Sequence, residues 1–114
     1  MSRDDATLLD ILKAARLVTE FKGKLAKQAF HRDIKTQSAI LHQLLVIGEA
    51  VKRLSEDFRA QHREIPWLRI AGMRDKLIHA YDAVDLDEVW KTVTKDIAPL
   101  ISFLEPLVPK EKIK

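Results

Sequence analysis

Residues able to do chemistry gather in one short segment, MRDKLIHAYDAVD at positions 73–85. It contains Arg74 and, five positions later, His79. An arginine can bind a phosphate through two parallel hydrogen bonds, and a histidine titrates near neutral pH and can transfer protons. Asp75 stands four positions before His79, close enough on a helix for its carboxylate to orient the imidazole. The segment is therefore a candidate site for acid–base chemistry at a phosphate.

These residues also have structural explanations. On a helical wheel Arg74 lies on the shoulder of a core stripe that includes Met73 and Leu77. A guanidinium there needs a salt-bridge partner or a polar cleft. His79 lies away from the stripe, where an ordinary surface position explains it. Five positions also separate the two side chains by about 140° around one helix, so two facing copies of the chain would aim them better at one target. That hypothesis depends on dimerisation.

Other catalytic schemes find no support. The chain has no cysteine, no histidine pair with the HExxH spacing of a zinc site, and no glycine-rich phosphate loop. No serine lies in a nucleophile-elbow context. The acids at 82, 85, 87 and 88 offer oxygen ligands, but helix capping explains them adequately. We therefore expect neither a metal site nor a cofactor.

The elements that position the segment are predicted from the spacing of apolar residues, which is helical throughout. With 3 glycines, 4 prolines and 46% hydrophobic residues, the 114-residue chain is expected to form one domain over 1–109, followed by a basic tail at 110–114. Short connections favour an all-α, up-down bundle of four to five helices that dimerises. The predicted helices are 4–22, a short one at 24–30, one capped by Asp33 that runs to about 60, 66–81, and one from about 86 that is kinked at Pro99 and ends before Pro109.

The middle of the long helix, AILHQLLVIGEAV at 39–51, is apolar nearly all round. Such a helix is covered on more than one side, and in a small bundle a second subunit often supplies the extra cover. Gly48 costs about 1 kcal/mol in a helix interior. It therefore either permits the close approach of another helix or is a tolerated surface glycine.

The net charge is +3, of which the tail contributes +2. Within the body, the most basic window spans 22–35 and is either a solvated turn or a contact for an RNA backbone. The N-terminus has acids where a secretory signal needs a basic start, and no apolar run reaches the length of a membrane helix. We therefore expect a soluble, cytoplasmic protein. The basic residues of the window are Lys22, Lys24, Lys27, Arg32 and Lys35.

The order Arg74, four residues, His79, one residue, Tyr81 matches the motif of HepT-like toxins within the HEPN superfamily. The spacing from arginine to histidine arises by chance in many helical proteins, but its surroundings are more specific. The segments VIGEAVKRLSEDF (46–58), IPWLRIAGMRDKLIHAYDAVDLDEVW (65–90) and KTVTKDIAPL (91–100) resemble that family in order and spacing. The N-terminal third resembles it only in general character.

The resemblance implies a helical dimer with both copies of the motif in one cleft, acting as a metal-independent endoribonuclease toxin. Arg74 would bind the phosphate, His79 would transfer a proton, and Asp75 matches the polar position that commonly follows the arginine. The implied partner is a minimal nucleotidyltransferase antitoxin of the MntA type, which transfers AMP from ATP to the motif tyrosine, here Tyr81. Glu49 also lies in a matching segment and should face a cleft or an interface near Arg74, or else point into solvent.

The implied reaction needs no metal. The ribose 2′-hydroxyl attacks the adjacent phosphorus, giving a 2′,3′-cyclic phosphate and a free 5′-hydroxyl, while arginine stabilises the growing charge. Two alternatives remain. One is a dimer that binds RNA or the nucleotidyltransferase without cutting, and the other is an accessory subunit that supports the partner's transfer reaction.

Overall fold

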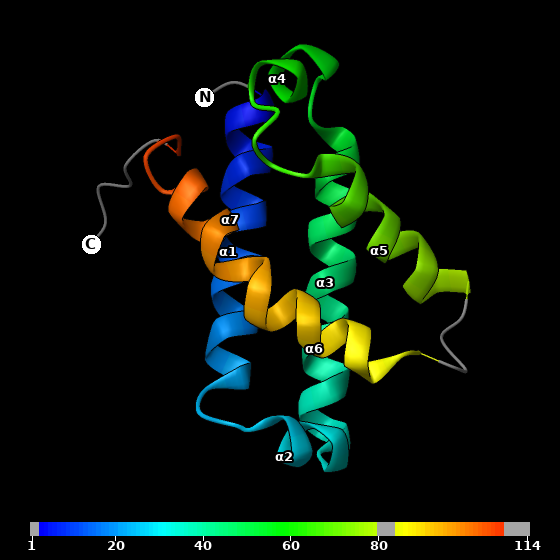
Figure 1. The fold of residues 1–114 in the computed structure, drawn as a ribbon. Helices are drawn as coiled ribbons and strands as arrows, with labels where there is room; N and C mark the ends of the chain where they lie inside the picture. The colour runs from blue at the N-terminus through cyan, green and yellow to red at the C-terminus, as the bar shows by residue number, and fades with distance from the viewer. Residues whose placement is uncertain (1–2, 80–83, 109–114) are drawn as a thin grey trace.

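The computed structural model describes residues 3–79 and 84–108, apart from the side chains of Ile78 and His79. Every regular element within those ranges is a helix, which confirms the predicted all-α bundle (Figure 1). None of these helices is long and apolar enough to cross a bilayer. They are α1 (Arg3–Lys22), α2 (Lys27–Arg32), α3 (Ile34–Arg53), α4 (Glu56–Gln61), α5 (Trp67–His79), α6 (Leu86–Lys95) and α7 (Ile97–Leu104).

Two antiparallel helices, α1 and α3, form the centre of the bundle (Figure 1). The predicted apolar face of α1 is buried, with Ile11, Ala15 and Val18 fully inaccessible to solvent. α5 packs along one flank of α3, while α6 and α7 pass across α1 and α3 on the viewer's side of Figure 1. The shared core explains how helices distant in sequence are brought together.

Caps define several helix ends where the sequence predicts them. Gly23 follows α1 with a φ of +50°, a left-handed conformation that glycine adopts without strain. The carboxylate of Asp33 accepts a hydrogen bond from the N–H of Thr36 at the start of α3, as expected. Asp85 likewise accepts from the N–H groups of Asp87 and Glu88 at the start of α6.

The prediction that the long helix continues to about residue 60 is wrong. α3 ends at Arg53, and α4 begins after Ser55. The Ser55 hydroxyl caps α4 by accepting from the N–H of Phe58, and the Ser55 N–H donates to the carboxylate of Asp4 in α1. A side-chain acceptor from a distant part of the chain thus takes the N–H that would have continued the helix.

Three further boundaries differ from prediction. The short helix is displaced to Lys27–Arg32, and the last helix is divided at Asp96 instead of being kinked at Pro99. Proline lacks the N–H that would bond the carbonyl of Lys95, so the ladder is interrupted before Pro99. Pro99 then occupies the first turn of α7, where a missing donor costs little. The last helix also ends earlier than predicted, at Leu104 instead of just before Pro109. The predicted end of α5 at 81 and the tail at 110–114 lie outside the described residues.

Part of the apolar middle of α3 is covered within the same chain. α1 packs on one side of α3 and α5 on another, so Ile47 and Ala50 are buried without a second copy. Leu41, Leu45 and Val46 in the same stretch are only partly buried, so cover by a second subunit stays a prediction.

Candidate active site

The site is built on the contact between α3 and α5, and Gly48 makes that contact possible. Gly48 is buried, and a Cβ placed on it would lie 2.1 Å from Cβ of Arg74 and 2.8 Å from its Cγ. Carbon atoms in favourable contact are about 3.5–4.0 Å apart. Only glycine therefore allows α5 to bring the base of Arg74 this close to α3. Of the two explanations considered for Gly48, close helix approach is confirmed.

The guanidinium of Arg74 is fixed by two carboxylates. Its Nη2 lies 2.8 Å from Oε1 of Glu49 on α3, and its Nη1 lies 3.2 Å from Oδ1 of Asp75, the next residue on α5. The expectation that Glu49 lies near Arg74 is confirmed. The Arg74 side chain is 26% exposed and that of Glu49 is 49% exposed, so the pair stands at the surface and is open to a ligand.

Asp75 is also held by a residue that the sequence analysis missed. Nζ of Lys52 on α3 donates to Oδ1 of Asp75 over 2.6 Å. This hydrogen bond, followed by the one from Arg74, holds the pKa of Asp75 below its ordinary value of 3.8. Lys52 lies three residues after Glu49 and so shares its helix face, which is the signal that could have revealed it.

Arg74, Lys52, Glu49 and Asp75 form a balanced set of two positive and two negative charges. Two of the five N–H groups of the guanidinium face these carboxylates, and the other three have no partner among the described residues and could bind a phosphate oxygen. An exposed ion-pair network of this kind contributes little to stability. Its consequence is geometric, because it fixes where the arginine presents its remaining donors.

The other two motif residues are His79 and Tyr81. His79 is the last residue of α5, and its side chain is not described. The expected contact between Asp75 and His79 therefore stays a prediction. Tyr81 lies outside the described residues. Among the described residues, no three His, Cys, Asp or Glu side chains come together as a possible metal site.

The basic window of 22–35 surrounds α2, at the end of the bundle remote from α4 (Figure 1). Lys27 pairs with Asp87 of α6 over 3.2 Å, and Nζ of Lys22 lies 5.3 Å from the ring centroid of Trp90. These two residues connect α6 to the end of the bundle. The other three, Lys24, Arg32 and Lys35, are exposed. Contact with RNA stays a prediction for all five.

Comparison with known proteins decides the family. Residues 11–107 match the family model described as Ribonuclease HepT-like. The chain belongs to the HepT-like ribonuclease family. This confirms the resemblance drawn from the motif and its surroundings.

Relatives align with this chain over most of their length. A protein of Thermococcus cleftensis named "Probable ribonuclease HepT" is 47% identical over 100 residues, covering 88% of this chain and 91% of the relative. A protein of Caldanaerobacter subterraneus subsp. tengcongensis, named as a "putative RNase", is 41% identical over 96 residues, covering 84% of this chain and 85% of the relative. No solved structure matches significantly. Membership of this family makes a ribonuclease role the starting point for interpreting the site around Arg74.

Proposed function

We propose that this HepT-like chain is a toxin that cuts RNA internally, without a metal, using Arg74 and His79. The observation that carries the proposal is the setting of Arg74 in a family of ribonucleases. Its guanidinium is fixed by Glu49 and Asp75 at a partly exposed position, and its three remaining N–H donors have no partner among the described residues. These donors suit a phosphate better than the ammonium of a lysine would.

In the proposed reaction, the ribose 2′-hydroxyl loses its proton and its oxygen attacks the adjacent phosphorus. The bond from phosphorus to the 5′-oxygen breaks, and the leaving oxygen gains a proton. Arg74 stabilises the charge that grows on the non-bridging oxygens, and His79 transfers a proton at the attacking or the leaving oxygen. Proton transfer of this kind contributes about 100- to 10,000-fold to a rate.

The proposal includes a homodimer. Arg74 and His79 are five positions apart on α5, about 140° around a straight helix. Two copies facing each other across a twofold axis would supply both side chains to one phosphate, and two histidines would divide the roles of base and acid. A stable monomer with full activity in sedimentation analysis would contradict this part of the proposal.

Control by a partner is the third part of the proposal. A nucleotidyltransferase antitoxin of the MntA type would add AMP to Tyr81, placing bulk and negative charge beside the motif and repelling RNA. Tyr81 is the only tyrosine of the sequence. Modification of tyrosine in this chain must therefore occur there, and mass spectrometry after incubation with partner and ATP should find AMP on wild type but not on Tyr81→Phe.

The central test is cleavage of labelled RNA by the purified chain in EDTA. We expect cyclic-phosphate products from wild type, and a loss of at least 100-fold for His79→Ala and for Arg74→Ala. His42→Ala is the matched control, because His42 is an exposed histidine on α3 outside this site. If the wild-type chain binds RNA without cleaving it, the proposed enzymatic activity is contradicted and the chain is a binding module.

A further inference from the structure

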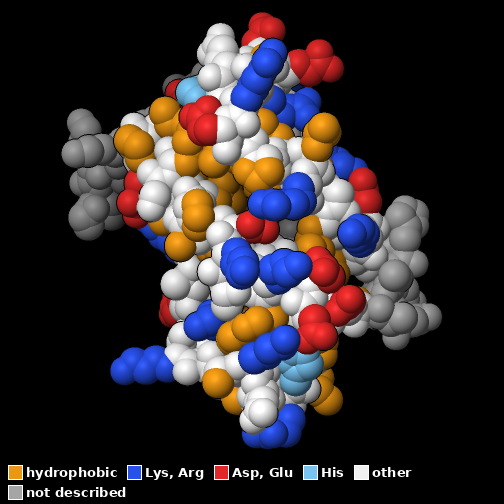
Figure 2. All heavy atoms as spheres, in the orientation of Figure 1, with side chains coloured by type: hydrophobic (Ala, Val, Ile, Leu, Met, Phe, Trp, Pro, Cys, Tyr) orange, Lys and Arg blue, Asp and Glu red, His pale blue; other side chains and the backbone are white. Residues whose placement is uncertain are grey.

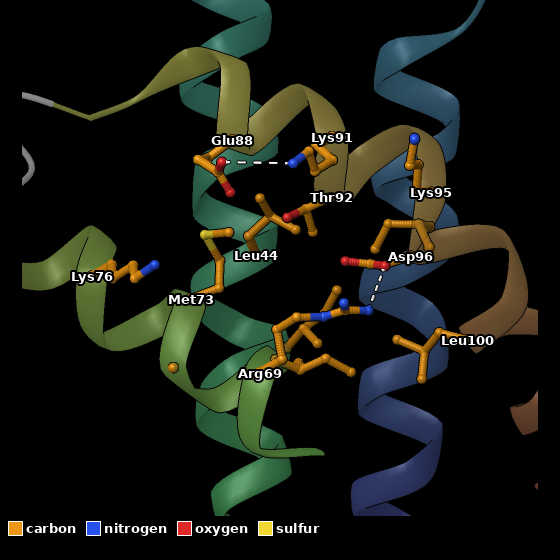
Figure 3. A pocket seen from close by; sticks show the side chains of 14 residues that line it. Leu44, Arg69, Met73, Lys76, Glu88, Lys91, Thr92, Lys95, Asp96 and Leu100 are labelled. Carbon is orange, nitrogen blue, oxygen red and sulfur yellow. Dashed lines mark hydrogen bonds and ion pairs between the residues drawn. The ribbon is translucent and has the colours of Figure 1, made fainter. Parts of the chain in front are cut away.

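A cavity lies beside α5, separate from the residues around Arg74. It is a cavity of about 300 Å³ between α3, α5, α6 and the start of α7 (Figure 3). Neither Arg74 nor Glu49 lines it. Because the cavity and Arg74 share α5, a ligand bound at Arg74 could extend into the cavity.

The floor of the cavity is apolar. Leu44 and Ile47 of α3, Met73 of α5 and Leu100 of α7 contribute to it. Gly72 forms part of the wall, and a Cβ placed there would meet no atom within 4 Å. The cavity therefore has unfilled space beside α5 and an apolar surface suited to an apolar group.

The rim of the cavity is mainly positive. Four basic and two acidic side chains line it, and Figure 2 shows Lys and Arg side chains gathered across the middle of this face. Arg69 pairs with Asp96 over 2.8 Å, and Lys91 lies 3.9 Å from Glu88, at different ends of the opening (Figure 3). Lys76 extends from α5 toward the opening and forms no ion pair with a described residue. Lys95 likewise forms no ion pair with a described residue, and the contact of Lys91 with Glu88 is a loose one. Four basic against two acidic side chains thus leave two positive charges in excess at the mouth of the cavity.

We propose that this cavity is a nucleotide subsite that takes one base on its apolar floor and the adjoining phosphate between Lys76 and Lys91. A ligand pocket of this size holds a group as large as one nucleoside but not a length of strand. Lys76 belongs to α5 and Lys91 to α6, so an anion at the mouth would be approached from two helices. An apolar floor with a cationic rim is the complement of a base joined to a phosphate.

This proposal rests on the proposed function, because a ribonuclease encounters a base joined to a phosphate as part of its RNA substrate. A helix is about 10 Å across, so a strand that crosses α5 would reach both the cavity and the remaining donors of Arg74. The same chemistry is offered by a free mononucleotide. The experiment therefore has an arm for each source.

The first arm measures binding of a fluorescein-labelled 2′-O-methyl RNA, which lacks the attacking hydroxyl, by anisotropy at several salt concentrations. In Lys76→Gln/Lys91→Gln, the contact with one phosphate is lost, and the slope of log affinity against log salt should become shallower by about 0.7. Gly72→Leu fills the cavity without changing charge, so it should weaken binding about tenfold and leave the slope unchanged. The matched control is Lys13→Gln/Arg63→Gln, which removes two exposed charges outside the cavity and should change neither quantity beyond the general effect of net charge.

The second arm measures thermal unfolding with AMP. If AMP raises the Tm of wild type but not of Gly72→Leu, the subsite binds free nucleotides. If both cavity variants weaken RNA binding and AMP has no effect on Tm, the subsite binds the substrate strand. Either result supports the proposal. It is overturned if the cavity variants bind RNA like the control and AMP either raises no Tm or raises the Tm of wild type and Gly72→Leu equally. Since the RNA used cannot be cleaved, this outcome is independent of whether the wild-type chain cuts RNA.

Discussion

Replacing Gly48 by alanine tests the close contact on which the Arg74 site depends. A Cβ at position 48 would begin 2.1 Å from Cβ of Arg74, so α5 would have to move away by about 1.5 Å to restore ordinary contact. The atom that it meets is at the base of a side chain attached to a helix, and it cannot turn aside. Overpacking of this kind costs about 1–3 kcal/mol.

Gly72→Ala is the matched control. Both glycines lie inside helices, so both substitutions gain about 1 kcal/mol of helix propensity. At Gly72 the added methyl group meets open space, and only this gain remains. The difference in unfolding free energy between the variants therefore isolates the overpacking, about 1–3 kcal/mol. For a chain of this size that corresponds to a Tm for Gly48→Ala lower by about 4–12 °C than that of Gly72→Ala.

Calorimetry or circular dichroism would give the two Tm values, and RNA cleavage at a temperature where both variants are folded would give the effect on the site. We expect cleavage by Gly48→Ala to fall at least tenfold, because a displacement of about 1 Å at a positioned catalytic group costs on the order of 100-fold. If Gly48→Ala is as stable as Gly72→Ala and cleaves like wild type, then α5 does not approach α3 at Arg74 as described.

Two further predictions concern the carboxylates around the guanidinium. Glu49→Ala removes the partner of Nη2 together with a negative charge, so kcat for RNA cleavage should fall at least tenfold without a rise in KM. A rise in KM with kcat unchanged would contradict a positioning role for Glu49. The pKa of Asp75 is lowered in the folded chain, chiefly by the hydrogen bond from Lys52. Its ionised form therefore contributes stability above its ordinary pKa of 3.8, and this contribution is lost as pH falls through the lower folded value. Urea unfolding at pH about 6 and about 3 should show a smaller acid-induced loss of stability in Asp75→Asn than in wild type. Equal losses would refute the coupling.

Local signals were sufficient to predict most of the helices. The core face of α1, the Asp33 cap and the Asp85 cap each depend on residues a few positions apart, and the structure confirms them. The end of α3 was missed partly because one of its causes is not local: the N–H of Ser55 bonds Asp4, 51 positions away, and this contact has no signature in the surrounding sequence. The other cause, the Ser55 cap on the N–H of Phe58, depends on neighbouring residues and could have been predicted.

For the candidate site, too, some features follow from the sequence and others only from the tertiary structure. The sequence by itself determined the family, the motif with Arg74 and His79, and the charge of Glu49 inside an apolar stretch, since these depend on residue type and order. Only the tertiary structure decided that Gly48 receives the base of Arg74 and that Lys52 holds Asp75. The reason is physical. Side-chain order along a helix is fixed by its 100° step, but which faces of two helices meet depends on how the whole core packs.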